Sequence, residues 1–136
     1  MDKVKQVIVM RTTYPDGKGG TKTVRKGKLI AQACHASIAF LTRKLIQEKK
    51  DEYCAVLTND EQNWILGKFA KVVVYVKTEE ELLALYAKCR EAKLTVHLIQ
   101  DAGDTEFNGE PTYTALGVGP HRSSLIDPIT RDLPLL

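Results

Sequence analysis

The sequence predicts an α/β fold in which helices pack over a mixed, largely parallel β-sheet. Four short apolar segments have the length and composition of strands, and longer segments with helical spacing of apolar residues separate the first three of them. Strands that alternate with helices favour a sheet in which most strands run in the same direction. With 136 residues, 43% of them hydrophobic, the chain is expected to form one domain over residues 1–136.

A first strand and a long loop are predicted within residues 4–25. The run Val-Ile-Val-Met within residues 4–11 is too short for most helices and rich in β-branched residues, which favours a buried strand. Residues 12–25 contain a Tyr-Pro-Asp-Gly turn signal and a cluster of glycines, so we expect a long, mobile loop there. The loop matches neither nucleotide-binding glycine motif, because both motifs require glycine where Lys22 stands.

Two helices and a second strand are predicted in the middle of the chain. The longer helix is expected over residues 26–49. Thr58 and Glu61 then form a capping-box pattern that begins a shorter helix, and Trp64 on this helix is expected in the core. Residues 71–76 form a continuous β-branched run, which is typical of a central strand covered on both faces.

A third helix, two strands and an apolar tail complete the predicted fold. Residues 78–81 repeat the capping-box pattern, and apolar residues follow at helical spacing, namely Leu82, Leu85, Tyr86 and Cys89. We interpret the glutamates of this segment as charge that stabilises the start of the helix. Strands are predicted over residues 94–100 and 113–118, and the tail over residues 123–136 is apolar enough to dock on the rest of the fold.

Residues 26–37 carry the pattern that points most directly to function. At about 100° per residue, Lys28, Gln32 and His35 project from one face of a helix. Gly27 leaves the helix N-terminus open to an anion or a developing negative oxygen. A helical histidine is more often solvated or hydrogen-bonded in the core than catalytic. The polar stripe alone therefore does not show whether these residues are catalytic. Small neighbouring residues favour a buried helix whose polar stripe opens into a cleft, namely Ala31, Ala33, Cys34, Ala36, Ser37 and Ala39.

A second polar segment is expected to reach the same place. In α/β sheets the ligand crevice lies beyond the carboxyl ends of the strands. The loop over residues 12–25 follows the first strand, and Asp101 follows the third, so both would emerge at this edge of the sheet. Asp101 also fits a simple turn at a strand end.

The net charge of +3 is concentrated in one segment of the chain. Residues 11–28 carry six cations against Asp16, a local charge of +5, which leaves −2 for the rest of the sequence. This cluster is consistent with a polyanionic partner, although a solvated lysine-rich loop would have the same composition.

Cysteine usage and hydropathy indicate the cytoplasm. The three cysteines are widely spaced and match no metal-ligand or disulfide pattern, so structural thiols in a reducing compartment are expected. No apolar run reaches the roughly 20 residues of a membrane span, and the N-terminus lacks the apolar region of a secretory signal. We therefore expect no membrane partner.

Several separated motifs, in the same order, resemble the archaeal and eukaryotic type of peptidyl-tRNA hydrolase, the second and structurally separate class of that activity. The resemblance covers nearly the whole chain. Its motifs are Lys26-Gly27-Lys28 with Ala31-Gln32 and His35-Ala36, Lys71-Val72-Val73, Asp101-Ala102-Gly103 with Thr105-Glu106, Thr114 with Leu116-Gly117-Val118-Gly119-Pro120, and Leu125-Ile126-Asp127 with Thr130.

The resemblance implies a three-layer α/β/α sandwich on a four-stranded mixed sheet, usually dimeric. It implies hydrolysis of the ester bond between a peptide and the terminal ribose of tRNA, which releases free tRNA, and it implies no metal or organic cofactor. Lys26 stands where a substrate-contacting lysine is usual. The residues that match the family's active site are Lys28, Gln32, His35, Asp101 and Thr105.

The roles of these residues are hypotheses, because no catalytic triad fixes them. Asp101 would orient water directly or through Lys28, and Lys28 would face the developing oxyanion. Gln32 and Thr105 would position the water or the terminal adenosine. His35 would share that role or be a core histidine.

Two features depart from the family pattern. Asp104 stands where a basic residue is usual, and the loop from Tyr14 to Val24 is longer than usual. The charge of Asp104 should repel a phosphate near Asp101, and we expect three cations to compensate by contacting tRNA phosphates from the other side, namely Lys18, Lys22 and Arg25.

Two other functions fit the same fold. One is a non-catalytic module that binds tRNA or a protein, and the other is an esterase that acts on a different acylated RNA or a small ester. The intact set of candidate catalytic residues argues against the non-catalytic module.

Overall fold

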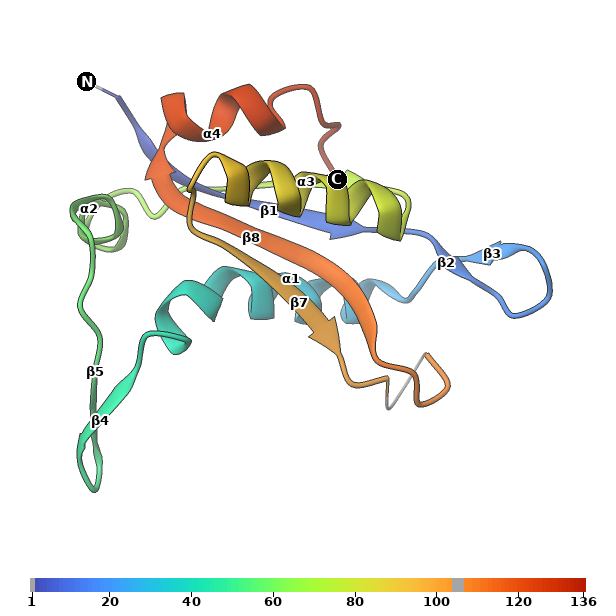
Figure 1. Cartoon of the computed structure of the whole chain (residues 1–136), viewed down its shortest axis with the longest axis horizontal. Helices are drawn as coiled ribbons and strands as arrows, with labels where there is room; N and C mark the ends of the chain where they lie inside the picture. Colours follow the sequence, from blue (N-terminus) through green and yellow to red (C-terminus); the bar gives the residue numbers. More distant parts are fainter. Residues whose placement is uncertain (1, 104–106) are drawn as a thin grey trace.

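A four-stranded sheet lies between two layers of helices, which confirms the predicted α/β/α sandwich (Figure 1). The computed structural model describes residues 2–103 and 107–136. Its elements, in chain order, are β1 (Val4–Arg11), β2 (Tyr14–Pro15), β3 (Thr21–Lys22), α1 (Lys26–Thr42), β4 (Ile46–Lys49), β5 (Glu52–Cys54), α2 (Asn59–Leu66), β6 (Lys71–Val76), α3 (Glu79–Glu91), β7 (Val96–Asp101), β8 (Thr112–Arg122) and α4 (Ser123–Thr130).

The main sheet is mixed, with the strand order β6-β1-β8-β7. Strand β1 pairs in parallel with β6, whereas β8 is antiparallel to both β1 and β7. Three of the four strands therefore run in the same direction, and β8 between them makes two of the three pairings antiparallel. The carboxyl ends of β1 and β7 consequently lie at the same end of the sheet. Ligand sites of α/β folds form at this end, which is called the carboxyl edge of the sheet below.

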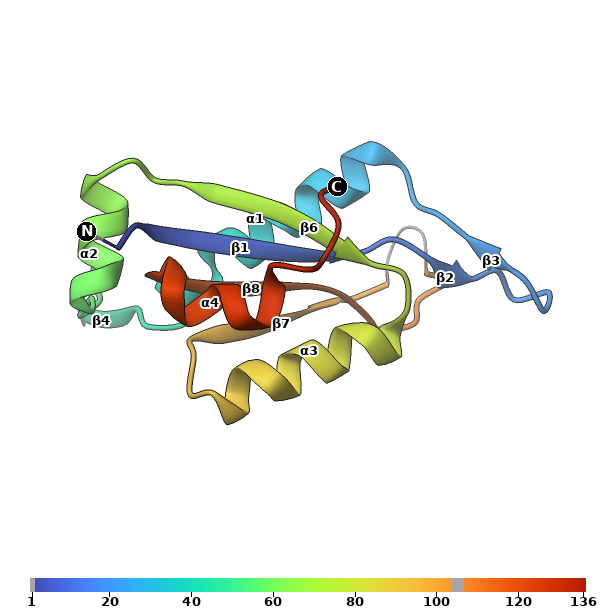
Figure 2. The same cartoon turned by 90° about the horizontal axis from the view of Figure 1, so that it is seen from above.

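Two hydrophobic cores form because successive side chains of a strand point to opposite faces. On β1, Val7 and Val9 belong to the core beneath α3 and α4. Ile8 and Met10 belong to the core beneath α1. Figure 2 shows α3 and α4 together on one face of the sheet, with α1 on the other face.

Helix α1 lies unusually close to the sheet. A Cβ atom at Gly117 on β8 would lie 2.1 Å from the carbonyl oxygen of Ala36, so only glycine fits beneath the helix here. The buried Gln6 side chain donates to the carbonyl of Ser37 at 2.8 Å and accepts from its hydroxyl at 2.6 Å, which ties α1 to β1. The small residues of this helix thus allow the close approach that the sequence predicts.

The predicted helix over residues 26–49 is wrong at its C-terminal end. Helix α1 ends at Thr42, and the chain continues into an exposed hairpin of β4 and β5, which projects from the sandwich (Figure 1). Just beyond the helix end, the ammonium group of Lys44 pairs with the buried carboxylate of Glu61. This contact lies 17 residues away in the chain and leaves no local signal.

The expectation of a central strand over residues 71–76 is also wrong, although both faces of β6 are covered. Strand β6 lies at the edge of the sheet, and its apolar residues pack into both cores. The C-terminal segment protects its outer edge: the amide of Tyr75 donates to the carbonyl of Pro134 at 3.1 Å, and that of Leu136 donates to the carbonyl of Val73 at 3.1 Å.

The remaining expectations differ from the structure mainly at element boundaries. Helix α2 begins with the complete capping box of Thr58 and Glu61, and Trp64 is buried as predicted. Thr78 caps α3, but Glu81 accepts from the amide of Lys77 instead of completing the box. Strand β8 extends to Arg122, four residues beyond its predicted end, and the tail docks through α4.

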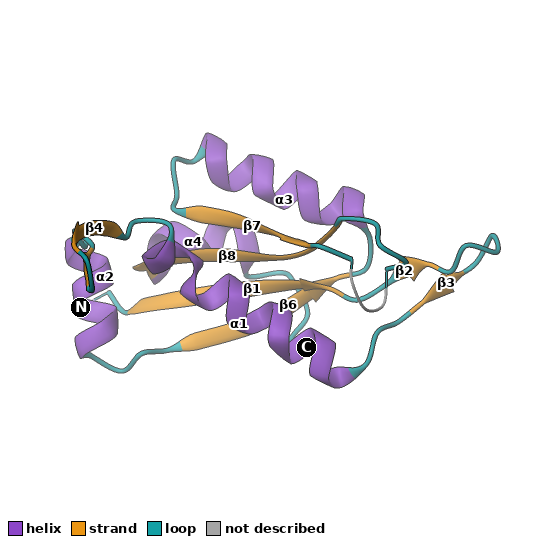
Figure 3. Ribbon diagram, turned by 90° about the horizontal axis from the view of Figure 1, so that it is seen from below, coloured by secondary structure: helices purple, strands orange, loops and turns teal. Residues whose placement is uncertain are grey.

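Within the expected loop over residues 12–25, two short strands form a hairpin. Tyr14 pairs with Lys22 and Pro15 with Thr21, and the Asp16 carboxylate accepts from two amides of the turn. Figure 3 shows the β2–β3 hairpin extending past the edge of the sheet. Within residues 2–103 and 107–136, no helix has both the length and the apolar character needed to cross a membrane.

We predict that Gly117→Ala lowers the free energy of unfolding by about 1–3 kcal/mol, because the new methyl group forces α1 away from β8. Urea unfolding monitored by circular dichroism measures this change. Gly27→Ala is the control, since a Cβ atom there has nothing within 4 Å. Equal stability of Gly117→Ala and the unmodified chain would show that α1 does not depend on this close contact.

Candidate active site

Two segments of the chain meet at the carboxylate of Asp101. The ammonium group of Lys28 donates to Asp101 Oδ1 at 2.9 Å, and the side-chain amide of Gln32 donates to the same oxygen at 3.0 Å. The backbone amide of Gly103 donates to Oδ2 at 2.8 Å. The structure thus joins the polar stripe of α1 to the end of β7, across 73 residues of sequence.

The fold holds these side chains at one end of the sandwich. Lys28 and Gln32 lie one turn apart near the start of α1, and Asp101 is the last residue of β7. Figure 1 shows the start of α1 and the end of β7 at the same end of the sheet as the β2–β3 hairpin. The Lys28 and Asp101 side chains are 12% and 14% exposed, so the pair is shielded but still reachable by water.

Thr114 completes the cluster, although the sequence pattern gave it no role. Its buried hydroxyl donates to Gln32 Oε1 at 2.6 Å, which turns the NH₂ group of Gln32 toward Asp101. The β7–β8 register shifts here: Ile99 pairs with Ala115 but Gln100 pairs with Tyr113, so Thr114 is an extra residue on β8. Such a bulge redirects a side chain relative to the regular alternation of a strand.

The hydrogen bonds to Asp101 favour its ionised form. Burial by itself raises the pKa of this carboxyl, but donation from Lys28, Gly103 and Gln32 outweighs that effect and holds the pKa below its ordinary value. The cluster therefore presents a carboxylate and an ammonium group side by side. A carboxylate can orient a water molecule, and an ammonium group can stabilise a negative oxygen.

His35 lies outside this hydrogen-bonded cluster. It is exposed on α1 and lines a separate cavity of about 400 Å³ with Thr42, Arg43 and Gln100. Thr105 and Asp104 lie outside the described residues.

The predicted tRNA-contacting cations lie on the β2–β3 hairpin and at the start of α1. Lys18 is exposed in the turn of the β2–β3 hairpin, and Lys22 lies on β3. Arg25 is the N-cap of α1, and Lys26 is its exposed first residue. Both the hairpin and the start of α1 extend from the sheet edge that carries Asp101 (Figure 3).

Metal-ligating side chains do not cluster in the part of the chain that the structure describes. No group of three or more histidine, cysteine or acidic side chains there has the arrangement of a metal site. Cys89 is buried in the core, which raises the pKa of its thiol to about 11, whereas Cys34 and Cys54 are exposed.

Comparison with known proteins places the chain among hydrolases. The profile of the family described as peptidyl-tRNA hydrolase PTH2 matches residues 4–136. A peptidyl-tRNA hydrolase of Methanothermobacter thermautotrophicus is 38% identical over 133 residues, covering 98% of this chain and 100% of that protein. Those of Methanopyrus kandleri and Sulfolobus acidocaldarius are 40% and 35% identical over 134 residues, covering 97% and 98% of this chain and 97% and 100% of those proteins.

We predict that Gln32→Met raises the pKa of Asp101 toward its ordinary value, because the ionised carboxylate loses a donor. Thr114→Val should raise it in the same direction by releasing the Gln32 amide. A ¹³C NMR titration of the Asp101 carboxyl carbon measures both shifts. Gln100→Met, at an exposed neighbouring position, should leave the pKa unchanged. An unchanged or lower pKa in Gln32→Met would contradict the proposed geometry.

Proposed function

We propose that Lys28 and Asp101 form the hydrolytic centre of this chain, which belongs to the peptidyl-tRNA hydrolase PTH2 family and hydrolyses peptidyl-tRNA. In this reaction the oxygen of water bonds to the acyl carbon of the ester, and the bond from that carbon to the terminal ribose of tRNA breaks. The ribose oxygen receives a proton, so the products are a free peptide and a tRNA that can be reused.

The observation that carries the assignment is the 2.9 Å contact between Lys28 and Asp101, made by residues from opposite halves of the chain. Both side chains lie at the sheet edge where ligand sites of α/β folds occur. Two further side chains, Gln32 and Thr114, hold the carboxylate in place through consecutive hydrogen bonds. Such preorganisation is the arrangement that an ester-hydrolysing site requires.

Asp101 acts on the attacking water by orienting it. A carboxylate has about four positions for accepting hydrogen bonds. Among the residues that the structure describes, Oδ1 of Asp101 accepts from Lys28 and Gln32, and Oδ2 accepts from Gly103. We assign the attacking water to Oδ2, which accepts from fewer of these donors. Because its pKa is lowered, the carboxylate is a weak base. Fixing the direction of attack is therefore its main contribution.

Lys28 stabilises the oxyanion that forms when water adds to the ester carbonyl. Its ammonium group is a positive charge fixed beside the reacting centre by Asp101. The start of α1 adds the positive end of the helix dipole, and its first turn contains no acidic residue to offset that field. Removing one such stabilising donor typically lowers kcat by about 10²–10³.

Further residues extend the site toward the nucleic acid. We assign phosphate contacts to the cations beside the cluster, namely Lys18, Lys22, Arg25 and Lys26. We assign to Thr105 and His35 the positioning of the attacking water or of the terminal adenosine of tRNA. A module that only binds tRNA is not favoured, because binding alone does not require an ion pair in a fixed geometry.

Translation supplies peptidyl-tRNA, so we place the chain in the cytoplasm. We propose that it acts there as one domain.

An apolar face of α1 supports a homodimer. Ile30 and Ile38 are 64% and 51% exposed on the outer side of the helix, with Cys34 between them. Two apolar cavities of about 350 and 370 Å³ flank this row and share Cys34 and Ser37 in their linings. Exposed apolar area of this kind is typical of an interaction surface, and we propose a second copy of the chain as its occupant.

We predict that Lys28→Met and Asp101→Asn each lower kcat for N-acetylaminoacyl-tRNA by about 10²–10⁴, because each removes a group positioned at the reacting bond. Single-turnover hydrolysis by the purified chain measures the effect. Lys88→Met, at an exposed position of α3, is the control. Parallel assays with unblocked aminoacyl-tRNA and a simple ester test the wider esterase function.

The hairpin lysines should give the opposite kinetic pattern. Lys18→Met and Lys22→Met should raise KM and leave kcat unchanged. Each variant should also lower the slope of the logarithm of tRNA affinity against the logarithm of salt concentration by about one. The reason is that one phosphate is no longer neutralised by the protein. If either hairpin variant lowered kcat as much as Lys28→Met, this separation of binding from chemistry would be incorrect.

We predict that Ile38→Asp converts the dimer to a monomer, because it buries a charge in the proposed interface. Light scattering after size exclusion measures the mass. Leu125→Asp, on α4 in the opposite layer, should leave the dimer intact. A monomeric unmodified chain, or a dimer in Ile38→Asp, would rule out this interface.

A further inference from the structure

Two aromatic rings join the β2–β3 hairpin to the segment that follows Asp101. The rings of Tyr14 and Phe107 lie 4.7 Å apart between centroids, inclined at 43°. Both side chains are almost fully buried, at 3% and 7% exposure. Tyr14 is the first residue of β2, so this contact fastens the base of the basic hairpin to the candidate active site.

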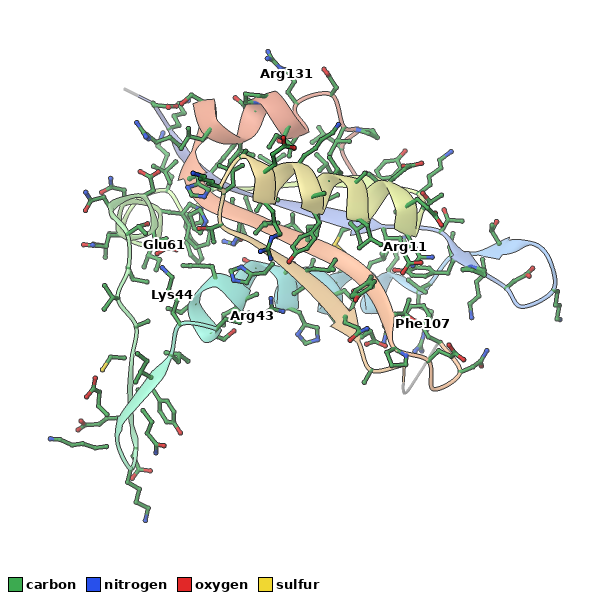
Figure 4. All side chains as sticks on the ribbon, in the orientation of Figure 1. Arg11, Arg43, Lys44, Glu61, Phe107 and Arg131 are labelled. Carbon is green, nitrogen blue, oxygen red and sulfur yellow. The ribbon has the colours of Figure 1, made fainter. Side chains whose placement is uncertain are left out.

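Each ring also faces a cation. The ammonium group of Lys28 lies 5.4 Å from the centre of the Phe107 ring, and the guanidinium group of Arg11 lies 4.3 Å from that of Tyr14. Arg11 is fixed by donation to the carbonyls of Thr13 and Tyr113 at 3.0 and 3.2 Å. Figure 4 shows Arg11 and Phe107 at the same end of the sandwich.

The two ring contacts form one continuous path from the hairpin to the ion pair. Arg11 fixes Tyr14, Tyr14 packs against Phe107, and Phe107 lies against the ammonium group that binds Asp101. A ring face attracts a cation electrostatically within about 6 Å, so Phe107 restricts the directions in which Lys28 can point. A hairpin with two-residue strands is marginal alone, so it depends on this contact in turn.

Backbone contacts hold Phe107 at this position. The amide of Glu110 donates to the carbonyl of Phe107 at 2.9 Å, and the amide of Gly109 donates to that of Gly103 at 2.8 Å. Gly103 has a φ of +89°, and a Cβ atom there would lie 2.3 Å from the carbonyl oxygen of Glu110. The segment that carries Phe107 is thereby closed against the residue that binds Asp101 Oδ2.

We propose that Tyr14 and Phe107 are positioning residues for Lys28, and that the β2–β3 hairpin is therefore part of the active site as well as of the tRNA-binding surface. Phe107 acts directly on the ammonium group, and Tyr14 acts through Phe107. The catalytic consequence rests on the function proposed above for Lys28, whereas the contact itself does not depend on that function.

The kinetic test separates ring electrostatics from simple packing. Phe107→Leu keeps an apolar side chain but removes the ring face, and we expect a loss in kcat of about 5- to 30-fold with unchanged KM. Phe107→Tyr keeps a ring face, so its kcat should equal that of the unmodified chain. Tyr14→Leu should lower kcat less than Phe107→Leu does, and Tyr14→Phe should not lower it. Phe69→Leu is the matched control, because Phe69 faces the ammonium group of Lys71 far from the site.

A cycle with Lys28 tests whether Phe107 acts through that residue. In a Lys28→Met background, Phe107→Leu should cost no further activity. Equal kcat for Phe107→Leu and Phe107→Tyr, or a full additional loss in the Lys28→Met background, would overturn the proposal.

An NMR measurement without substrate tests the contact independently of hydrolysis. The Phe107 ring should shift the Lys28 ε-methylene protons upfield. This shift should disappear in Phe107→Leu, decrease in Tyr14→Leu and persist in Tyr14→Phe. A shift that survives Phe107→Leu would overturn the proposal even if the chain is fully active. A chain that fails to hydrolyse peptidyl-tRNA but shows the expected shifts would contradict the catalytic assignment alone.

Discussion

The ion pair between Lys28 and Asp101 requires a fixed distance between the start of α1 and the end of β7. The packing of α1 on β8 restrains that distance, because Gly117 leaves room for the carbonyl of Ala36. Because the pair is largely shielded from water, loss of either partner would leave a poorly solvated charge. The hydrogen bond from Gln32 reduces that cost. The fold thus serves the site mainly by holding one helix close to one sheet.

Much of the candidate site could be anticipated from spacing alone. Helical periodicity placed Lys28 and Gln32 on one face, and the position of Asp101 at a strand end brought it to the same edge of the sheet. The same periodicity included His35, but this residue lies about 10 Å further along the helix axis than Lys28 and faces Arg43 and Gln100 instead of Asp101. Thr114 belongs to the motifs that carry the family resemblance, but its contact with Gln32 could not be predicted, because a bulge redirects its side chain and the sequence pattern assumes regular alternation.

The fold was predictable where local signals were strong. Capping and apolar periodicity identified the helices and strands, whereas boundaries set by distant contacts were missed. Beyond the early end of α1, Lys44 pairs with the distant Glu61, and β6 lies at an edge that the C-terminal segment covers. The hairpin over residues 12–25 resembled a loop because its two strands are only two residues long. For α1 and β6, the contacts that differ from the prediction lie outside the window in which propensity acts.

The central claim is that Lys28 and Asp101 work as one unit, and a double-mutant cycle on kcat tests it most directly. The account predicts that the combined Lys28→Met and Asp101→Asn variant is no slower than the slower of the two single variants. Independent losses that multiply in the double variant would contradict it, because they would show that the two side chains contribute to hydrolysis separately.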